Sequence, residues 1–196
     1  MELEALSDPL AALLAWHREA LEKNLPEPDA CTLATATLSG KPSARIVLFK
    51  GIVNGDVQFV TNYASRKGRE IAENPAVALV FYWHALLRQV RVEGEASFAT
   101  AEESDAYFRT RPRESQLGAW ASLQSQPVAS RAELERRLRE VEQRFEGKEV
   151  ERPEHWGIYR IRVETVELWV AGAHRLHDRC LFTRTAEGWR PARLFP

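Results

Sequence analysis

A two-residue turn at Asn54-Gly55 is the feature that most constrains the fold of this chain. Asn-Gly between two runs of β-type residues is the strongest short-range signal of a β-hairpin, because both residues readily adopt the positive φ angles that the turn requires. The flanking runs are SARIVLFKGIV (residues 43–53) and DVQFVTN (residues 56–62). The sequence therefore predicts an antiparallel pair of strands here.

Further runs of β-branched and aromatic residues extend this pattern. Strands are predicted at residues 30–38, 75–83, 87–98, 156–164, 166–172 and 179–185, and residues 189–195 are a weaker candidate. The almost wholly apolar run PAVALVFYW (75–83) predicts burial on both faces, and Gly94 is expected to mark a bend or bulge. Six to eight antiparallel strands with helices between them predict a mostly β fold, a small barrel with flanking helices.

Five segments carry helix signals: residues 7–24, 65–74, 100–108, 114–122 and 130–145. In the first, Ser7 is the expected N-cap, and an apolar stripe runs through Leu10, Leu13, Leu14, His17 and Leu21. Thr100 and Glu103 form a predicted capping box. We expect one domain over residues 1–196, with an N-terminal helix within residues 1–24 and a charged amphipathic helix within residues 129–146.

Length and charge exclude several classes of protein. The 196 residues suffice for one domain with its own core. A formal net charge of −1 argues against a general nucleic-acid or membrane binder, which needs a basic excess. No signal peptide or membrane-length apolar run is readable, and Cys31 and Cys180 lack a metal-type spacing. The sequence predicts a cytoplasmic protein without a metal site.

Cations stand at the ends of predicted elements, whereas phosphate-loop, nucleophile-elbow and HExxH motifs are missing from the sequence. Arg45 and Lys50 belong to the strand RIVLFK, and TNYASRK places Thr61, Arg66 and Lys67 at a strand-to-helix turn. A helix N-terminus would add backbone N–H donors there, which suits a phosphate. The alternative is that these cations are solvated residues of a first helical turn.

A second cationic stretch is YFRTRPRESQLGAW. Tyr107 and Arg111 are four residues apart and share a helix face, and Ser115 lies one turn further if the helix continues past Pro112. Two interpretations are open, a second anion site or a solvent-facing arginine cluster broken by proline.

Polar residues near later strands suit a flat heterocyclic ligand. Gln89, Gln124 and Ser125 offer uncharged hydrogen-bonding groups, and Trp169 either stacks on such a ring or fills the core. The loop HRLHDR (174–179) follows the strand VELWVAG and is either a chance surface loop or a binding element. Two phosphate-type sites and no acid–base pair together favour an enzyme whose cofactor carries the redox chemistry.

Four motifs occur together in this order: RIVLFK, TNYASRK, RPRESQLGAW and VELWVAGAHRLHDR. They resemble those of the pyridoxamine (pyridoxine) 5′-phosphate oxidases, and the ending ARLFP resembles the C-terminus of that family. The resemblance runs from about Asp8 to Pro196. It implies an FMN-binding split β-barrel and a homodimer with FMN at the interface. Members with an N-terminal extension carry a basic, tyrosine-containing segment over the substrate, whereas this chain starts almost directly at DPLAALLAW.

The resemblance also implies roles for individual residues. FMN contacts are implied for Arg45, Ile46, Val47, Leu48, Phe49, Lys50, Val60, Thr61, Arg66, Lys67, Gln89, Gln124, Ser125, Trp169 and Arg179, some of them reaching across from the other subunit. Substrate contacts are implied for Lys50, Tyr107, Arg111, Ser115, Arg175 and His177. Of these, Arg175 and His177 match the catalytic residues over the pyridine ring.

The implied reaction is oxidation of pyridoxamine or pyridoxine 5′-phosphate to pyridoxal 5′-phosphate, by hydride transfer from C4′ to flavin N5. O2 then reoxidises the flavin and yields H2O2. One alternative is a related FMN oxidase of the same fold acting on another aromatic substrate, of the phenazine type. The other is a split barrel that binds flavin or haem without catalysis.

Overall fold

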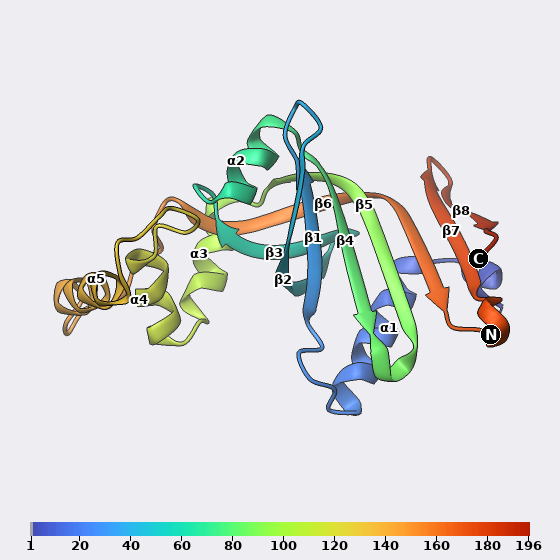
Figure 1. The fold of residues 1–196 in the computed structure, drawn as a ribbon, viewed down its shortest axis with the longest axis horizontal. Helices are drawn as coiled ribbons and strands as arrows, with labels where there is room; N and C mark the ends of the chain where they lie inside the picture. The colour runs from blue at the N-terminus through green and yellow to red at the C-terminus, as the bar shows by residue number, and fades with distance from the viewer. Residues whose placement is uncertain (1) are drawn as a thin grey trace.

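The computed structural model describes residues 2–196 and contains one eight-stranded antiparallel sheet (Figure 1). Its strands are β1 (Ala30–Ala36), β2 (Pro42–Val53), β3 (Asp56–Asn62), β4 (Ala76–Trp83), β5 (Arg88–Phe98), β6 (Trp156–Val170), β7 (Asp178–Thr185) and β8 (Gly188–Arg193). The order is β3-β2-β1-β4-β5-β6-β7-β8, and β3 also pairs with β6. The first six strands therefore close into a barrel, from which β7 and β8 extend. The predicted mostly β, split-barrel fold with flanking helices is confirmed.

Strand β6 runs unbroken through the region where two strands were predicted. The sequence interpretation placed a break at Thr165, but residues 156–170 form one strand. The polar residues there lie at a bulge: Glu93 pairs with Thr165 and Gly94 with Val163, so Glu164 is the extra residue. A Cβ on Gly94 would lie 2.1 Å from the carbonyl oxygen of Arg162, which explains the glycine at this predicted bulge.

The predicted hairpin between β2 and β3 is confirmed, with positive φ at both Asn54 and Gly55. The prediction for β4 was wrong, because its residues alternate between buried and more exposed positions and Tyr82 is 51% exposed. One face of β4 packs into the barrel, and the other belongs to an open sheet face that also carries Ile46 and Leu48.

The helices are α1 (Pro9–Glu22), α2 (Arg66–Glu73), α3 (Ala101–Arg109), α4 (Arg113–Ala121) and α5 (Arg131–Arg144), with short 3-10 turns at Leu3–Ala5, His84–Leu86 and Ala173–Arg175. The capping box of α3 is confirmed. Helix α1 is capped by Asp8 rather than Ser7, and it buries Leu10, Leu13, Trp16 and Ala20 while Leu14 and Leu21 are exposed. Within residues 2–196, no helix is long and apolar enough to cross a membrane.

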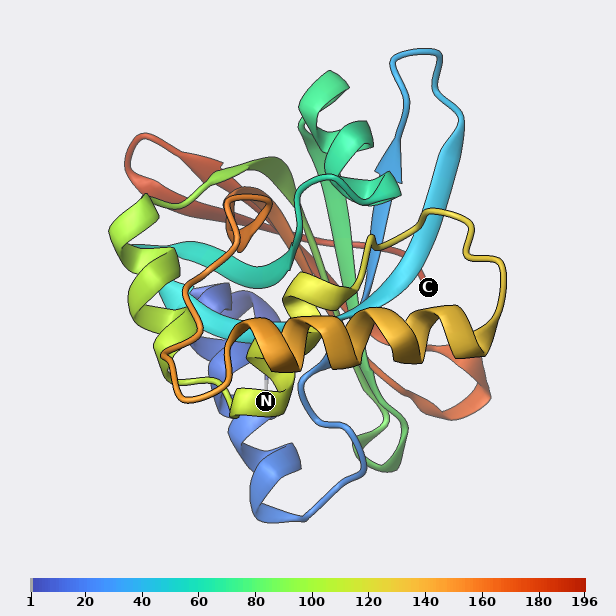
Figure 2. The ribbon, with the colours of Figure 1, turned by 90° about the vertical axis from the view of Figure 1, so that its left-hand side faces the viewer.

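Two apolar clusters hold the structure together. The larger fills the barrel and packs against α1. The smaller joins α3, α4 and α5 through Phe108, Leu117, Phe145, Val150 and Trp156, and Figure 2 shows α5 lying across this end. Figure 1 places α4 and α5 at one end of the long axis and the β7–β8 hairpin at the other. This separation decides which predicted site residues meet within one chain.

Candidate functional site

A pocket of about 370 Å³ lies between β3, α4 and the segment that follows α4. We call it the α4 pocket. Its lining consists of Val60, Thr61, Asn62, Arg111, Ser115, Gly118, Ala119, Ser122, Gln124 and Trp156. It therefore brings together residues predicted for the flavin (Val60, Thr61 and Gln124) and residues predicted for a substrate phosphate (Arg111 and Ser115).

Arg111 is the polar group in this pocket whose bonding is incomplete. Its guanidinium carbon lies 4.4 Å from the ring centre of Trp156 and 5.6 Å from that of Phe108. Its Nη1 is buried and has no hydrogen-bond partner within residues 2–196. Burial lowers the pKa of Arg111. An unpaired buried donor costs about 1–3 kcal/mol, so an anion bound here would relieve an existing cost.

The helix around Arg111 does not continue past Pro112. Helix α3 ends at Arg109, and α4 begins at Arg113. Ser115 lies in the first turn of α4, after the break at Pro112, and lines the same pocket as Arg111. Tyr107 lies beside the pocket, with its ring stacked 6.2 Å from that of Trp156.

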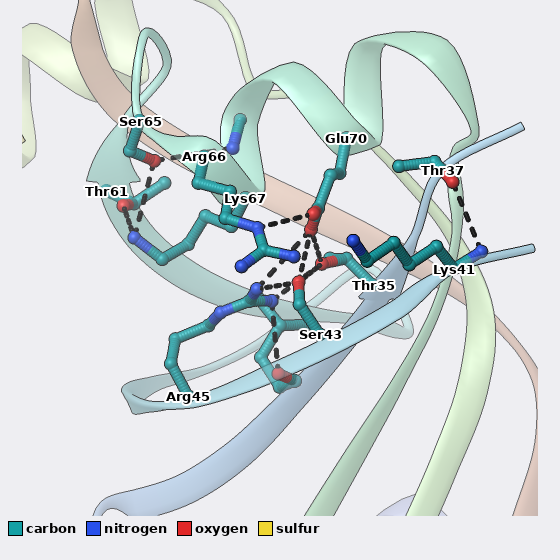
Figure 3. A network of polar contacts seen from close by, with 12 residues as sticks. Thr35, Thr37, Lys41, Ser43, Arg45, Thr61, Ser65, Arg66, Lys67 and Glu70 are labelled. Carbon is teal, nitrogen blue, oxygen red and sulfur yellow. Dashed lines mark hydrogen bonds and ion pairs between the residues drawn. The ribbon is translucent and has the colours of Figure 1, made fainter. Parts of the chain in front are cut away.

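A cation cluster lies beside the α4 pocket at the start of α2, and consists of Arg45, Arg66, Lys67 and Glu70 (Figure 3). Ser65 caps α2 by accepting a hydrogen bond from the Gly68 N–H. A Cβ on Gly68 would lie 2.0 Å from the carbonyl oxygen of Tyr63, so this tight turn requires glycine.

Lys67 is 8% exposed, and among the described residues its hydrogen-bond acceptors are all neutral oxygens. Its Nζ lies 3.0 Å from Thr61 Oγ1, 3.3 Å from Ser65 Oγ and 2.9 Å from Gln124 Oε1. Burial, with a smaller contribution from Arg45, lowers its pKa to about 8. A buried cation without a carboxylate partner favours an anionic ligand.

Glu70 is the carboxylate of the cluster and is 5% exposed. It accepts hydrogen bonds from Thr35 Oγ1 and Ser43 Oγ, both at 2.5 Å, from Arg66 Nε at 2.8 Å and from Arg45 Nη2 at 3.4 Å. Burial alone would raise the pKa of Glu70, but the hydrogen bonds from Ser43, Thr35 and Arg66 hold it at about 2.

Lys50 lies away from the cation cluster, on the same strand as Arg45. Its Nζ is 3.7 Å from Asp29 Oδ2, and the other oxygen of Asp29 lies 2.8 Å from His17 Nε2. The predicted segment 45–50 alternates in direction: Ile46 and Leu48 face the open side of the sheet, whereas Val47 and Phe49 are buried in the barrel.

The second group of predicted residues lies around the loop between β6 and β7, residues 171–177, which we call the β6–β7 loop. Arg175 is exposed, and His174 and Arg175 both have positive φ, at 55° and 65°. The His177 ring lies 4.7 Å from that of Trp169, and the Gly172 N–H donates to His177 Nδ1 at 3.1 Å. Consecutive positive φ values at non-glycine residues are costly and gather at functional sites.

Gln89, Trp169 and Arg179 lie in one row across β5, β6 and β7. Arg179 Nε donates to Glu167 at 2.8 Å, and Arg179 Nη1 donates to the Phe195 carbonyl at 3.0 Å. The hydrogen bond that Arg179 donates to the Glu167 carboxylate raises the pKa of Arg179.

The structure thus divides the predicted site residues into two groups. Arg45, Thr61, Arg66, Lys67, Arg111, Ser115 and Gln124 lie around the cation cluster and the α4 pocket, whereas Gln89, Trp169, Arg175, His177 and Arg179 lie around the β6–β7 loop. Ser125 follows Gln124 in an exposed segment with a φ of 71°. Within residues 2–196, no group of three or more His, Cys, Asp or Glu side chains is placed to hold a metal ion.

Sequence reasoning missed Glu70 and Glu167, the two buried carboxylates that hold predicted arginines. In the sequence, each resembles an ordinary surface glutamate, because a charged residue type does not reveal whether the fold buries its side chain. The polar strand positions Thr35 and Ser43 were the only available signal, since such hydroxyls need partners when buried.

The chain matches two family models that together span most of its length. Residues 17–145 match the model described as pyridoxamine 5′-phosphate oxidase. Residues 156–196 match the model described as the pyridoxine 5′-phosphate oxidase C-terminal dimerisation region.

Proteins named pyridoxine/pyridoxamine 5′-phosphate oxidase are similar over almost the whole chain. The one from Rubrobacter xylanophilus is 58% identical and covers 96% of this chain and 87% of its own. The one from Thermosynechococcus vestitus is 49% identical and covers 100% of this chain and 92% of its own.

Among solved structures, PhzG from Burkholderia lata, in complex with tetrahydrophenazine-1-carboxylic acid, is similar with a TM-score of 0.92 and 30% identity. That match covers 98% of this chain and 95% of PhzG. The family-model match over residues 17–145, the identity of 49–58% and the shared barrel lead to one conclusion. The chain belongs to the pyridoxamine 5′-phosphate oxidase family.

Proposed function

We propose that this chain is an FMN-dependent oxidase that converts pyridoxamine 5′-phosphate or pyridoxine 5′-phosphate to pyridoxal 5′-phosphate, with O2 as acceptor and H2O2 as product. The observation that carries the proposal is the unpaired, buried Nη1 of Arg111 in a pocket that also contains Ser115. This donor set fits a substrate phosphate. The names of relatives that are 49–58% identical support the same substrate class.

The cation cluster fits the phosphate of FMN. It holds three cations and one carboxylate, and Lys67 is buried among neutral oxygens. In this proposal FMN is held by Arg45, Ile46, Val47, Leu48, Phe49, Lys50, Val60, Thr61, Arg66, Lys67, Gln124 and Ser125 of one protomer. When bound, FMN supplies the redox chemistry by accepting two electrons from the substrate and passing them to O2.

The substrate phosphate is assigned to Lys50, Tyr107, Arg111 and Ser115. Its pyridine ring is assigned to Arg175 and His177, which orient the reacting carbon towards the flavin. Holding two planar rings in register is the main task of the protein, because proximity and orientation alone supply much of the rate enhancement. The absence of an acid–base pair from the sequence motifs is compatible with this task.

A homodimer is supported by the match of residues 156–196 to a dimerisation region. We propose that each active site takes the cation cluster and the α4 pocket from one protomer and Gln89, Trp169, Arg175, His177 and Arg179 from the other. The separation of the two groups within one chain supports this arrangement. Ile46 is 62% exposed and Tyr82 51% exposed, so the open sheet face offers apolar surface for such contact.

The proposed function is tested by a visible spectrum of the FMN-loaded protein under anaerobic conditions, before and after pyridoxamine 5′-phosphate is added. We expect the flavin band to bleach and to return when air is admitted, with H2O2 formed. A flavin that stays oxidised would contradict the oxidase assignment, and failure to bind FMN would contradict the cofactor assignment.

The second candidate is an FMN oxidase of the phenazine type, and the likeness to PhzG favours it. A substrate without a phosphate would leave Arg111 unpaired, which argues for the first candidate. Bleaching by a reduced phenazine carboxylate but not by pyridoxamine 5′-phosphate would reverse this choice. We also propose a cytoplasmic location, because Cys31 and Cys180 are buried free thiols.

A further inference from the structure

Glu70 contacts two of the three cations proposed for the FMN phosphate. The carboxylate receives hydrogen bonds from β1, β2 and α2, so it ties together three elements that meet at the site (Figure 3). Arg66 uses only its Nε for Glu70, and its two terminal nitrogens have no hydrogen-bond partner within the described part of the chain. Glu70 therefore fixes the orientation of Arg66 and leaves its terminal donors available.

Arg45 is held in a similar way. Its Nη1 donates to Thr35 Oγ1 at 2.7 Å and to the Leu33 carbonyl at 3.3 Å, and its Nη2 donates to Ser43 Oγ and to Glu70. Thr35 and Ser43 in turn donate to Glu70. The carboxylate is thus the common acceptor of a network that fixes Arg45 both directly and through two hydroxyls.

The charge of the cluster also depends on Glu70. Arg45, Arg66 and Lys67 carry three positive charges, and the ionised Glu70 leaves a net charge of +2. A phosphate monoester carries about −1.5 to −2 at neutral pH, because its second pKa is about 6. Without Glu70, three cations would repel one another at the start of a helix, where the dipole also disfavours positive charge.

We propose that Glu70 is a positioning residue for the phosphate of FMN, which orders Arg45 and Arg66 before the ligand arrives and matches the charge of the cluster to a phosphate dianion. This inference rests on the proposed function, since it concerns the same FMN site. It extends that function to a residue that does not itself face the ligand. Fixed supporting residues of this kind keep contact groups within the narrow geometry that tight binding requires.

The test compares FMN with riboflavin, which lacks the phosphate, by fluorescence titration of the apoprotein. We expect Glu70→Gln to raise the Kd for FMN by about 10-fold or more, as loss of a supporting contact does at other sites, and to leave the Kd for riboflavin within about twofold. The matched control is Glu73→Gln, because Glu73 is an exposed glutamate on the same helix. Its removal changes the charge equally, and both Kd values should stay within about twofold.

Two results would overturn the proposal. If Glu70 acts only as a nearby negative charge, its removal will tighten FMN binding or leave it unchanged. If Glu70 only supports the fold, the Kd values for FMN and riboflavin will rise together. Should Glu70→Gln fail to fold, Ser43→Ala removes one donor to the carboxylate, and a rise of about threefold for FMN alone is expected, whereas no rise rejects the proposal. Failure of wild-type protein to bind FMN would instead reject the proposed function.

Discussion

The cation cluster and the β6–β7 loop carry similar side chains but are built in opposite ways. The four residues of the cluster come from β2 and α2 and are tied together by hydrogen bonds among themselves and with hydroxyls of β1, β2 and β3, and two of them, Lys67 and Glu70, are buried. In the loop, Arg175 and His177 are two residues apart, Arg175 is exposed, and the backbone itself is in a costly conformation. The first region is organised within one protomer, whereas the second presents its groups outward.

This difference indicates where the free energy of binding comes from. Arg111 has a buried nitrogen without a partner within the described residues, and Lys67 is buried without a carboxylate partner there, so both are suited to hold anions. The side chains of the β6–β7 loop become buried only when another surface covers the loop. We therefore expect variants of the loop to affect turnover and variants of the pocket to affect binding.

The largest effect is expected for Arg175→Ala. Removing a cation placed over the substrate ring should lower kcat by about 100-fold, as loss of one electrostatic contact to the reacting group does elsewhere. FMN should remain bound, because the proposed phosphate site lies in the other region. Steady-state kinetics and the flavin content of the purified protein measure both quantities. Arg190→Ala, an exposed arginine on β8, is the control and should behave like wild type.

Arg111→Ala should mainly raise the KM for pyridoxamine 5′-phosphate, by about 30-fold, because a charge-assisted contact contributes about 1.5–3 kcal/mol. Since that contact exists before and during the reaction, kcat should change little. The variant loses the contact of the guanidinium with Trp156 but also an unpaired buried nitrogen, so its thermal melt should stay close to that of wild type. Arg109→Ala, an exposed residue at the end of α3, is the control. An unchanged KM would refute the phosphate assignment.

Mixing these two variants tests whether the regions meet across a dimer. In a heterodimer of Arg111→Ala and Arg175→Ala, one of the two composite sites is intact and the other carries both changes. After subunit exchange, activity at low substrate should reach about a quarter of the wild-type value, which is about eightfold above Arg111→Ala alone and about 25-fold above Arg175→Ala alone. No recovery, with exchange verified by mass spectrometry of differently tagged chains, would mean that both residues act within one protomer.

The smallest expected effect is a pH dependence of FMN binding. The pKa of Lys67 is lowered to about 8, so without ligand the side chain loses its proton above that pH. The phosphate binds the charged form better, so relative to pH 7 the Kd for FMN should be about twofold higher at pH 8 and about fourfold higher at pH 8.5. Folding stability has the opposite pH dependence. Between pH 8 and the ordinary pKa of lysine, the unfolded apoprotein binds more protons at Lys67 than the folded apoprotein does. The free energy of unfolding therefore increases with pH over this range. Riboflavin, titrated in parallel, should show no such step, and a step for both ligands would exclude Lys67 as its cause.

Local signals in the sequence predicted much of the fold correctly. Asn54-Gly55 specifies its turn through backbone preference, and Thr100 with Glu103 specifies the start of α3 through side-chain hydrogen bonds. Such signals work because all the interacting atoms are within a few residues. The same local reasoning failed at β6. This strand stays continuous across its polar bulge because it pairs with β3, β5 and β7, which are distant in the sequence.

The candidate site shows the same division. The sequence by itself determined which cations and hydroxyls occur in ordered motifs, and hence the family and the chemistry to expect. Only the tertiary structure decided that Glu70 is buried and bonded to two arginines, that Arg111 keeps a nitrogen unpaired within the described residues, and that the β6–β7 loop lies at the opposite end of the long axis from α4 and α5. The physical reason is that burial and pairing depend on contacts between residues far apart in sequence, and the motifs do not record those contacts.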